Sequence, residues 1–273
     1  PACISLSQDI QGQTFDYPED FFKEKIHAIR RPRPDEFQIK EAAEKIKSSK
    51  NPIIISGGGV FYSDAMEELS KFAIKHNIPV TQTVMGYSTM KRDHSHYAGQ
   101  IGALGGKNTN SLAKQTDLAI AVGTKLADFT TGSWTNFENE NFKLVSINVS
   151  RFDANKHLAQ AVVGDARASL NELSAALGDW KAPDGWNKKS QIELKAWNEH
   201  VDKESAPTNQ EVPSYVQVVG SIYKNSDPSD IAVTAAGGLV GEVIQVWRPR
   251  ELNTHETEWG FSCMSYEISG ALG

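Results

Sequence analysis

Short apolar runs alternate with amphipathic segments through the first two thirds of the chain. Runs typical of strands buried on both faces occur at 53–55, 78–81, 118–122, 144–149 and 161–163. Between them, apolar residues recur at the spacing of one helical face, as at Ile39, Ala42, Ala43 and Ile46. This alternation predicts an α/β fold with a doubly wound parallel sheet at 36–180.

Polar residues and glycines mark the ends of the helices expected in this region. Asp35, with Gln38 three positions later, has the spacing of a capping box. Asp165 is expected to cap a later helix, and Gly178 to end it. The apolar positions of that helix are Leu170, Leu173 and Leu177. Two further helices are expected, one around Met66 and one at 107–115.

The segments on the N-terminal side differ in character. Residues 2–6 have the composition of a buried strand, and we expect 1–12 to be the end of another domain. Residues 13–35 are polar and contain the basic, proline-containing run 30–34, which predicts a solvated linker.

On the C-terminal side, residues 181–211 predict a second linker with a surface helix, and 212–273 begin a third unit. In that unit we expect a helix whose apolar face comprises Tyr215, Val218, Val219 and Ile222. A strand at 230–235 and a helix at 262–272 should follow. The outer segments therefore predict partial α/β domains, and a chain that is a piece of a longer one.

Composition excludes several classes of protein. The chain has 273 residues, and 28 basic against 34 acidic side chains give a net charge of −6. This balance argues against a nucleic-acid binder, and no apolar run approaches the roughly 20 residues that span a bilayer. The two cysteines, Cys3 and Cys263, do not form a disulfide framework, which favours a cytoplasmic setting. Cys263 is expected to be a buried thiol.

The glycine-rich turn at 56–59 is the first candidate for a binding site. It follows a strand and precedes a helix, so its backbone N–H groups could face a phosphate. The dinucleotide fingerprint needs a third glycine where Tyr62 stands, and an acidic residue after the second strand, which ends at 80–83. A tight structural turn is therefore favoured over an NAD site.

Two other clusters carry polar chemistry. His94 and His96 could be metal ligands, but no further cluster supports them, so we expect a surface loop and no metal site. Residues 254–273 gather polar and acidic groups before a helix of small residues, which predicts a ligand pocket between this unit and another surface.

Three segments together resemble the thiamine-diphosphate-dependent enzymes of the acetolactate synthase type. They are Asn-Pro-Ile-Ile-Ile-Ser-Gly-Gly-Gly at 51–59, Ala-Val-Gly-Thr at 121–124 with Ile-Asn-Val at 147–149 and Gly-Asp at 164–165, and Gly-Phe-Ser-Cys-Met-Ser-Tyr at 260–266. The last segment, with Ser-Gln-Asp-Ile-Gln-Gly at 7–12, most resembles the family's hydrolases of cyclic 1,2-diones in myo-inositol catabolism. The resemblance covers essentially the whole chain.

The resemblance implies three domains per subunit and a homodimer or homotetramer. Residues 1–12 would end the pyrimidine-binding domain, 36–180 would be the central domain, and 212–273 would begin the diphosphate-binding domain. It implies thiamine diphosphate and Mg²⁺ as cofactors. The positions that match cofactor-binding residues are Gly237, Gly238 and Leu239 beside the diphosphate, and Ser262 and Met264 beside the aminopyrimidine.

The implied reaction is carbon–carbon cleavage that opens the ring of a small cyclic 1,2-dione. Glu256, Glu258 and Glu267 are candidates for moving protons or binding substrate hydroxyls, and helix capping or surface charge is an equally open interpretation. The family's activating glutamate and its magnesium motif match no part of this chain. We therefore expect this chain alone to be inactive and to bind the cofactors weakly or not at all.

Two alternatives remain open within this resemblance. A lyase of the acetolactate synthase kind, or an oxidative decarboxylase of malonic semialdehyde, would use the same cofactor. A non-catalytic domain that binds FAD or ADP is the alternative of a different class, because the central domains of some relatives hold such nucleotides.

Overall fold

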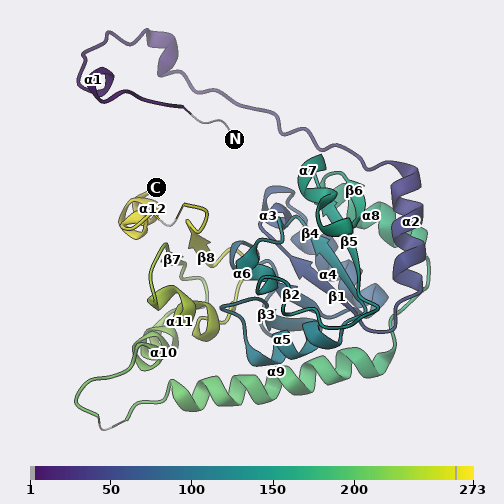
Figure 1. The fold of residues 1–273 in the computed structure, drawn as a ribbon. Helices are drawn as coiled ribbons and strands as arrows, with labels where there is room; N and C mark the ends of the chain where they lie inside the picture. The colour runs from purple at the N-terminus through teal and green to yellow at the C-terminus, as the bar shows by residue number, and fades with distance from the viewer. Residues whose placement is uncertain (1–3, 209, 262) are drawn as a thin grey trace. The chain divides into compact units, whose positions relative to one another are not determined.

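The computed structural model describes residues 4–208, 210–261 and 263–273, and it separates residues 1–30 from 31–273 as two compact units (Figure 1). In the first unit, α1 (Gln8–Gln11) and the 3-10 turn η1 (Glu19–Phe21) are the regular elements of its described part. Aromatic rings contact one another around Tyr17, whose ring centroid lies 4.9 Å from that of Phe21.

The prediction of a strand at 2–6 is wrong for residues 4–6. Residues 2 and 3 lie outside the described part. Residues 4–6 form no strand, and the side chains of Ile4 and Leu6 are exposed. A strand needs a neighbour for its backbone N–H and C=O groups. The described part of residues 1–30 provides no strand to pair with.

The second unit is built on a six-stranded parallel sheet in the order β3-β2-β1-β4-β5-β6. Its strands are β1 (Pro52–Ser56), β2 (Val80–Gln82), β3 (Tyr97–Gln100), β4 (Leu118–Val122), β5 (Lys143–Asn148) and β6 (Gln160–Val163). The order reverses between β1 and β4, as in doubly wound folds. The predicted fold class is confirmed, and β3 is the one strand of this sheet that the hydrophobic pattern missed.

Helices cover both faces of the sheet, which explains the continuous apolar runs (Figure 1). Ile54 belongs to a core cluster with residues of α2 (Glu36–Lys47), α4 (Met66–His76) and α8 (Ala166–Leu177). Its neighbours Ile53 and Ile55 point to the other face, where they join Leu112 of α5 (Lys107–Gln115). Shorter elements are α3 (Gly59–Tyr62), η2 (Val84–Gly86), α6 (Asp128–Thr131), α7 (Arg151–Ala154) and η3 (Lys156–Leu158).

Both predicted helix caps are present. The Asp35 side chain accepts hydrogen bonds from the backbone N–H groups of Phe37 and Gln38 at the start of α2. Gln38 does not complete a capping box, because its Oε1 accepts from the Val163 N–H at 2.9 Å, at the end of β6. Gly178 follows α8 with φ of 64° and ends it as expected.

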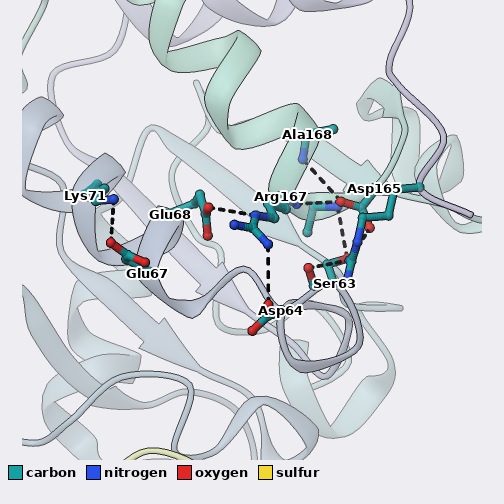
Figure 2. A network of polar contacts seen from close by, with 10 residues as sticks. Ser63, Asp64, Glu67, Glu68, Lys71, Asp165, Arg167 and Ala168 are labelled. Carbon is teal, nitrogen blue, oxygen red and sulfur yellow. Dashed lines mark hydrogen bonds and ion pairs between the residues drawn. The ribbon is translucent and has the colours of Figure 1, made fainter. Parts of the chain in front are cut away.

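The expectation of a solvated basic run at 30–34 is wrong for Arg31. Its guanidinium donates to Asp165 Oδ2 at 3.1 Å and to the Ser63 carbonyl oxygen, and the Asp165 N–H donates to the Pro32 carbonyl at 2.8 Å. Asp165 Oδ1 also accepts from Arg167 N and Ala168 N (Figure 2). The segment is therefore attached to the first turn of α8.

The second expected linker contains a long helix that belongs to the core. Helix α9 (Asp184–Glu204) contacts α5 and the edge strand β3 (Figure 1). Trp186 is buried near its start, and the indole Nε1 donates to the Pro52 carbonyl at 2.8 Å. The charged residues around Trp186 lie on the other faces of α9, which made the helix resemble a surface element.

The C-terminal residues form α10 (Tyr215–Asn225), β7 (Ala232–Thr234), α11 (Leu239–Val246), β8 (His255–Thr257) and α12 (Tyr266–Leu272). Strands β7 and β8 pair in parallel. The predicted helix at α10 exists, but its buried contacts come from Val219 and Tyr223, whereas Tyr215 and Ile222 are exposed. Among the described residues, no helix is both long and apolar enough to cross a membrane.

Candidate functional site

A cavity of about 530 Å³ lies where β7, β8 and α12 face the carboxyl end of the central sheet. The sheet side is formed by α3 and by the turn after β2, with Gly58, Tyr62 and Met85 among the lining residues. Open α/β sheets bind ligands at this edge. The cavity agrees with the pocket that the sequence predicted between the third unit and another surface.

The opposite wall of the cavity contains the buried polar residues of β8. His255 Nε2 lies 3.2 Å from Thr234 Oγ1, and burial lowers the pKa of His255 to about 4, so its imidazole is neutral near pH 7. Thr257 also lines the cavity, and its Oγ1 has no hydrogen-bond partner within the described parts of the chain. Strand β8 was not predicted, because its three residues are all polar, although buried and exposed positions alternate along it.

The glycine turn after β1 is shaped by packing of backbone against backbone. An added Cβ on Gly57 would lie 2.5 Å from the Gly123 carbonyl oxygen, and one on Gly59 would lie 2.6 Å from Gly123 Cα. Side chains are excluded at both positions because the turn after β1 contacts the turn after β4. The structural interpretation of this turn is therefore supported, and only Gly58 of the three lines the cavity.

The glycine turn after β7 is different, because it is open. Gly237 has φ of 99°, and added Cβ atoms on Gly237 and Gly238 would meet nothing within 4 Å. The turn leads into α11, and Leu239, the first residue of this helix, is exposed. A positive-φ glycine before a helix, with free space above it, is compatible with the close approach of a phosphate group. These residues therefore fit the diphosphate part of thiamine diphosphate.

The loop after β8 is held by Glu258. Its Oε1 accepts from Phe261 N and its Oε2 from Cys263 N, both at 2.7 Å. Hydrogen bonds from the backbone of Cys263 and then of Phe261 lower the pKa of the Glu258 carboxyl. A carboxylate used in this way shapes the loop, which favours the capping interpretation of Glu258 in this structure.

The other predicted site residues lie nearby but are not brought into one cluster. Glu256 accepts from the Tyr266 hydroxyl at 3.3 Å, and Glu267 is half-buried in the first turn of α12. Met264 is exposed, and Ser262 lies outside the described residues. Among the described residues that were predicted to move protons or to bind the cofactor, Glu256 is the one that lines the cavity.

Two expectations about single residues need correction. Cys263 is exposed, because the helix begins at Tyr266 and the thiol lies in the preceding loop. His96 is buried, with its Nε2 3.1 Å from Asn77 Oδ1, because it directly precedes the unpredicted strand β3. His94 Nε2 lies 2.9 Å from Ser70 Oγ. The described segments contain no group of three or more potential metal ligands.

Comparison with known proteins agrees with the α/β fold class. Residues 39–173 match the family model described as the thiamine pyrophosphate enzyme, central domain. The chain is 37% identical, over 99% of its length, to proteins of Geobacillus thermodenitrificans and Clostridium tetani named 3D-(3,5/4)-trihydroxycyclohexane-1,2-dione hydrolase. It is 36% identical to the protein of Bacillus licheniformis that has the same name.

The chain spans less than half of these relatives, 45% of the Geobacillus thermodenitrificans protein and 46% of the other two. Within the chain, the region matched by the family model runs from the first helix of the central unit, α2, into α8. It therefore contains all six strands of the parallel sheet. The similarity to the central domain of the thiamine pyrophosphate enzymes therefore extends over the whole parallel sheet.

Proposed function

We propose that this chain is part of a thiamine-diphosphate-dependent hydrolase that opens the ring of trihydroxycyclohexane-1,2-dione by cleaving a carbon–carbon bond. The observation that carries the proposal is the 37% identity along 99% of the chain to relatives with that name. Because those relatives are more than twice as long, the proposed activity belongs to an enzyme that contains this chain.

The proposed cofactor position follows from the open glycine turn. Backbone N–H groups at Gly237, Gly238 and Leu239 would bind the diphosphate, because these residues leave free space at the start of α11. Thiamine diphosphate supplies a nucleophilic carbon and an electron sink when it is bound. We assign the Mg²⁺ ligands to the part of the relatives that this chain does not span.

The proposed role of the 258–266 loop is to place the residues beside the aminopyrimidine. Glu258 fixes the loop through its two backbone contacts, and we assign Ser262 and Met264 to hydrogen bonding and steric support of the cofactor. Glu256 and Glu267 are then the carboxylates that remain to move a proton or to bind substrate hydroxyls. Glu258 acts as a positioning residue in this arrangement.

The activity is tested with the enzyme that contains this chain. It should convert the trihydroxycyclohexanedione to a ring-opened acid, followed by mass spectrometry, only with thiamine diphosphate and Mg²⁺ present. Turnover of pyruvate to acetolactate, or decarboxylation of malonic semialdehyde, without ring opening would instead identify the lyase or the decarboxylase alternative. Dione hydrolysis that continues after removal of the cofactor would contradict the proposal.

The loop assignment can be tested separately in the same enzyme. Glu258→Ala removes both acceptors that hold the loop, so it should raise the thiamine diphosphate concentration needed for half-maximal activity. Glu211→Ala, on an exposed segment outside the loop, is the matched control. An unchanged cofactor requirement in Glu258→Ala would assign Glu258 to surface charge.

A second candidate function follows from the 530 Å³ cavity beside Gly58, Tyr62 and Met85. Its position at the edge of the sheet and its mixed aromatic and polar lining would accommodate a nucleotide such as FAD or ADP. A flavin absorption band, or adenine nucleotide released on denaturation of the purified chain, would support nucleotide binding. If neither signal is seen after incubation with FAD and with ADP, this second candidate is excluded.

A further inference from the structure

A second, much smaller cavity lies between the edge strand β3, helix α9 and helix α11. Its volume is about 10 Å³, and its lining includes Gln100 from β3, Leu194 and Asn198 from α9, and Ile244 from α11, with Arg248 just after α11. It is separate from the 530 Å³ cavity, with which it shares no lining residue. The cavity is lined by segments far apart in the sequence.

Unpaired polar atoms gather around this cavity. The Gln100 side chain is 5% exposed, and neither its Nε2 nor its Oε1 has a hydrogen-bond partner within the described residues. Arg248 is 6% exposed, and its Nε also lacks a partner there. Buried polar groups of folded proteins are normally hydrogen-bonded to protein or to ordered water.

The remaining contacts of Arg248 leave its Nε free for another partner. Arg248 Nη2 donates to Asp202 Oδ1 at 2.5 Å, and Nη1 donates to Asn198 Oδ1 at 3.3 Å. These bonds hold the guanidinium against α9. Arg248 and Gln100 both line the cavity.

Size and hydrogen-bond chemistry together restrict the occupant. A volume of about 10 Å³ corresponds to a single water-sized probe. The occupant must accept from Arg248 Nε–H and Gln100 Nε2–H and donate to Gln100 Oε1, because those are the atoms without partners. A cation cannot accept from the guanidinium, and an apolar molecule satisfies none of these atoms.

We propose that a single structural water molecule is bound in this cavity and bridges the Gln100 side chain of β3 to Arg248 Nε after α11. The water joins the edge of the central sheet to the C-terminal helices through hydrogen bonds that the protein side chains do not make directly. This water site plays no part in the proposed catalysis, and the proposal does not depend on the cofactor.

The test is a water–protein nuclear Overhauser experiment on the chain with ¹⁵N-labelled arginine and glutamine. The Arg248 Nε–H and the Gln100 Nε2–H protons should both show cross-peaks to water, with the sign expected for a long-lived bound water rather than for water of the surface hydration shell. Absence of these cross-peaks in the unmodified chain would overturn the proposal without any variant.

A pair of variants tests the bridge itself. Gln100→Met keeps the side-chain length and removes both polar atoms, so the cross-peak at Arg248 Nε–H should be lost or strongly reduced. Gln245→Met is the control, because Gln245 is partly exposed, lines the same cavity, and is not among the residues with buried polar atoms that lack a hydrogen-bond partner. This variant should leave the cross-peak intact. An undiminished cross-peak in Gln100→Met would contradict the bridge.

Discussion

At the scale of single residues, the glycine turn after β1 shows how a remote backbone contact selects an amino acid. Gly59 is a helix residue with ordinary backbone angles, yet an added Cβ would lie 2.6 Å from Gly123 Cα. The clash involves backbone on both sides, so no side-chain rotation can relieve it. Packing of this kind makes glycine necessary without any need for left-handed geometry.

We therefore predict that Gly59→Ala lowers the free energy of unfolding by about 1–3 kcal/mol, because the two turns must move apart. Gly185→Ala, in α9, should raise it by about 0.4–1 kcal/mol, since nothing lies near the new methyl group and alanine favours a helix. Urea denaturation of both variants is the measurement. Equal effects of the two substitutions would contradict the packing argument.

His255 gives a pH dependence at the same scale. Burial lowers its pKa from 6.5 to about 4, so between these values the unfolded chain binds a proton that the folded chain does not. Stability is therefore complete above pH 6.5 and falls as the pH is lowered toward 4, by roughly 3 kcal/mol for this residue.

His255→Gln should flatten the stability profile between pH 6.5 and 4, as followed by urea unfolding at a series of pH values. His200→Gln, at an exposed histidine on α9, is the control for the loss of a histidine as such. If His255→Gln keeps the full slope of the unmodified chain, another group is responsible for the acid sensitivity.

At the scale of elements, the local pattern succeeded where the cause is local. The helices at α2, α5 and α8 and the strands β1 and β4 were predicted because their apolar spacing is their own property. Strands β3 and β8 were missed because they are short and carry polar residues. Each is stabilised by pairing with a strand elsewhere in the sequence, β2 for β3 and β7 for β8.

The attachment of 31–35 to α8 is also an element-scale effect. Asp165 is buried at the first turn of α8 and contacts the guanidinium of Arg31, whereas the pair between Arg33 and Glu172 is largely exposed on the arginine side. A buried carboxylate that loses its cation is costly, and an exposed ion pair contributes little.

Arg31→Ala should therefore lower the free energy of unfolding by about 1–3 kcal/mol, and it should increase proteolysis between residues 13 and 35. Arg33→Ala should change the free energy by no more than about 1 kcal/mol. Urea unfolding combined with limited proteolysis tests both. A larger effect of Arg33→Ala than of Arg31→Ala would show that the buried contact is not the important one.

At the scale of the whole molecule, the candidate site depends on regions distant in sequence. The cavity of about 530 Å³ needs α3 and the turn after β2 on one side and β7, β8 and α12 on the other. Hydrogen bonds hold these regions together: the Tyr87 hydroxyl donates to the Trp247 carbonyl at 2.6 Å, and Thr254 N donates to Ser88 Oγ at 3.2 Å.

For this chain alone, we predict a dissociation constant for thiamine diphosphate with Mg²⁺ weaker than about 1 mM in a calorimetric titration. The open turn at Gly237 and Gly238 provides backbone donors, but the described residues include no cluster of three or more metal ligands. The enzyme that contains this chain is the positive control. Tight, saturable binding to the chain alone would contradict the assignment of the metal ligands to other parts of the enzyme.

The amino-acid sequence was sufficient to predict the α/β class, five of the six strands of the central sheet, the helices α2, α4, α5 and α8, and the two aspartate caps, because each follows from local spacing. Tertiary structure decided that Arg31 has a buried partner, that α9 covers the sheet edge, that Cys263 is exposed, and that two glycine turns of similar composition differ in the space around them. These properties depend on which distant residues become neighbours, and backbone contacts between remote turns leave no periodic signal in the sequence.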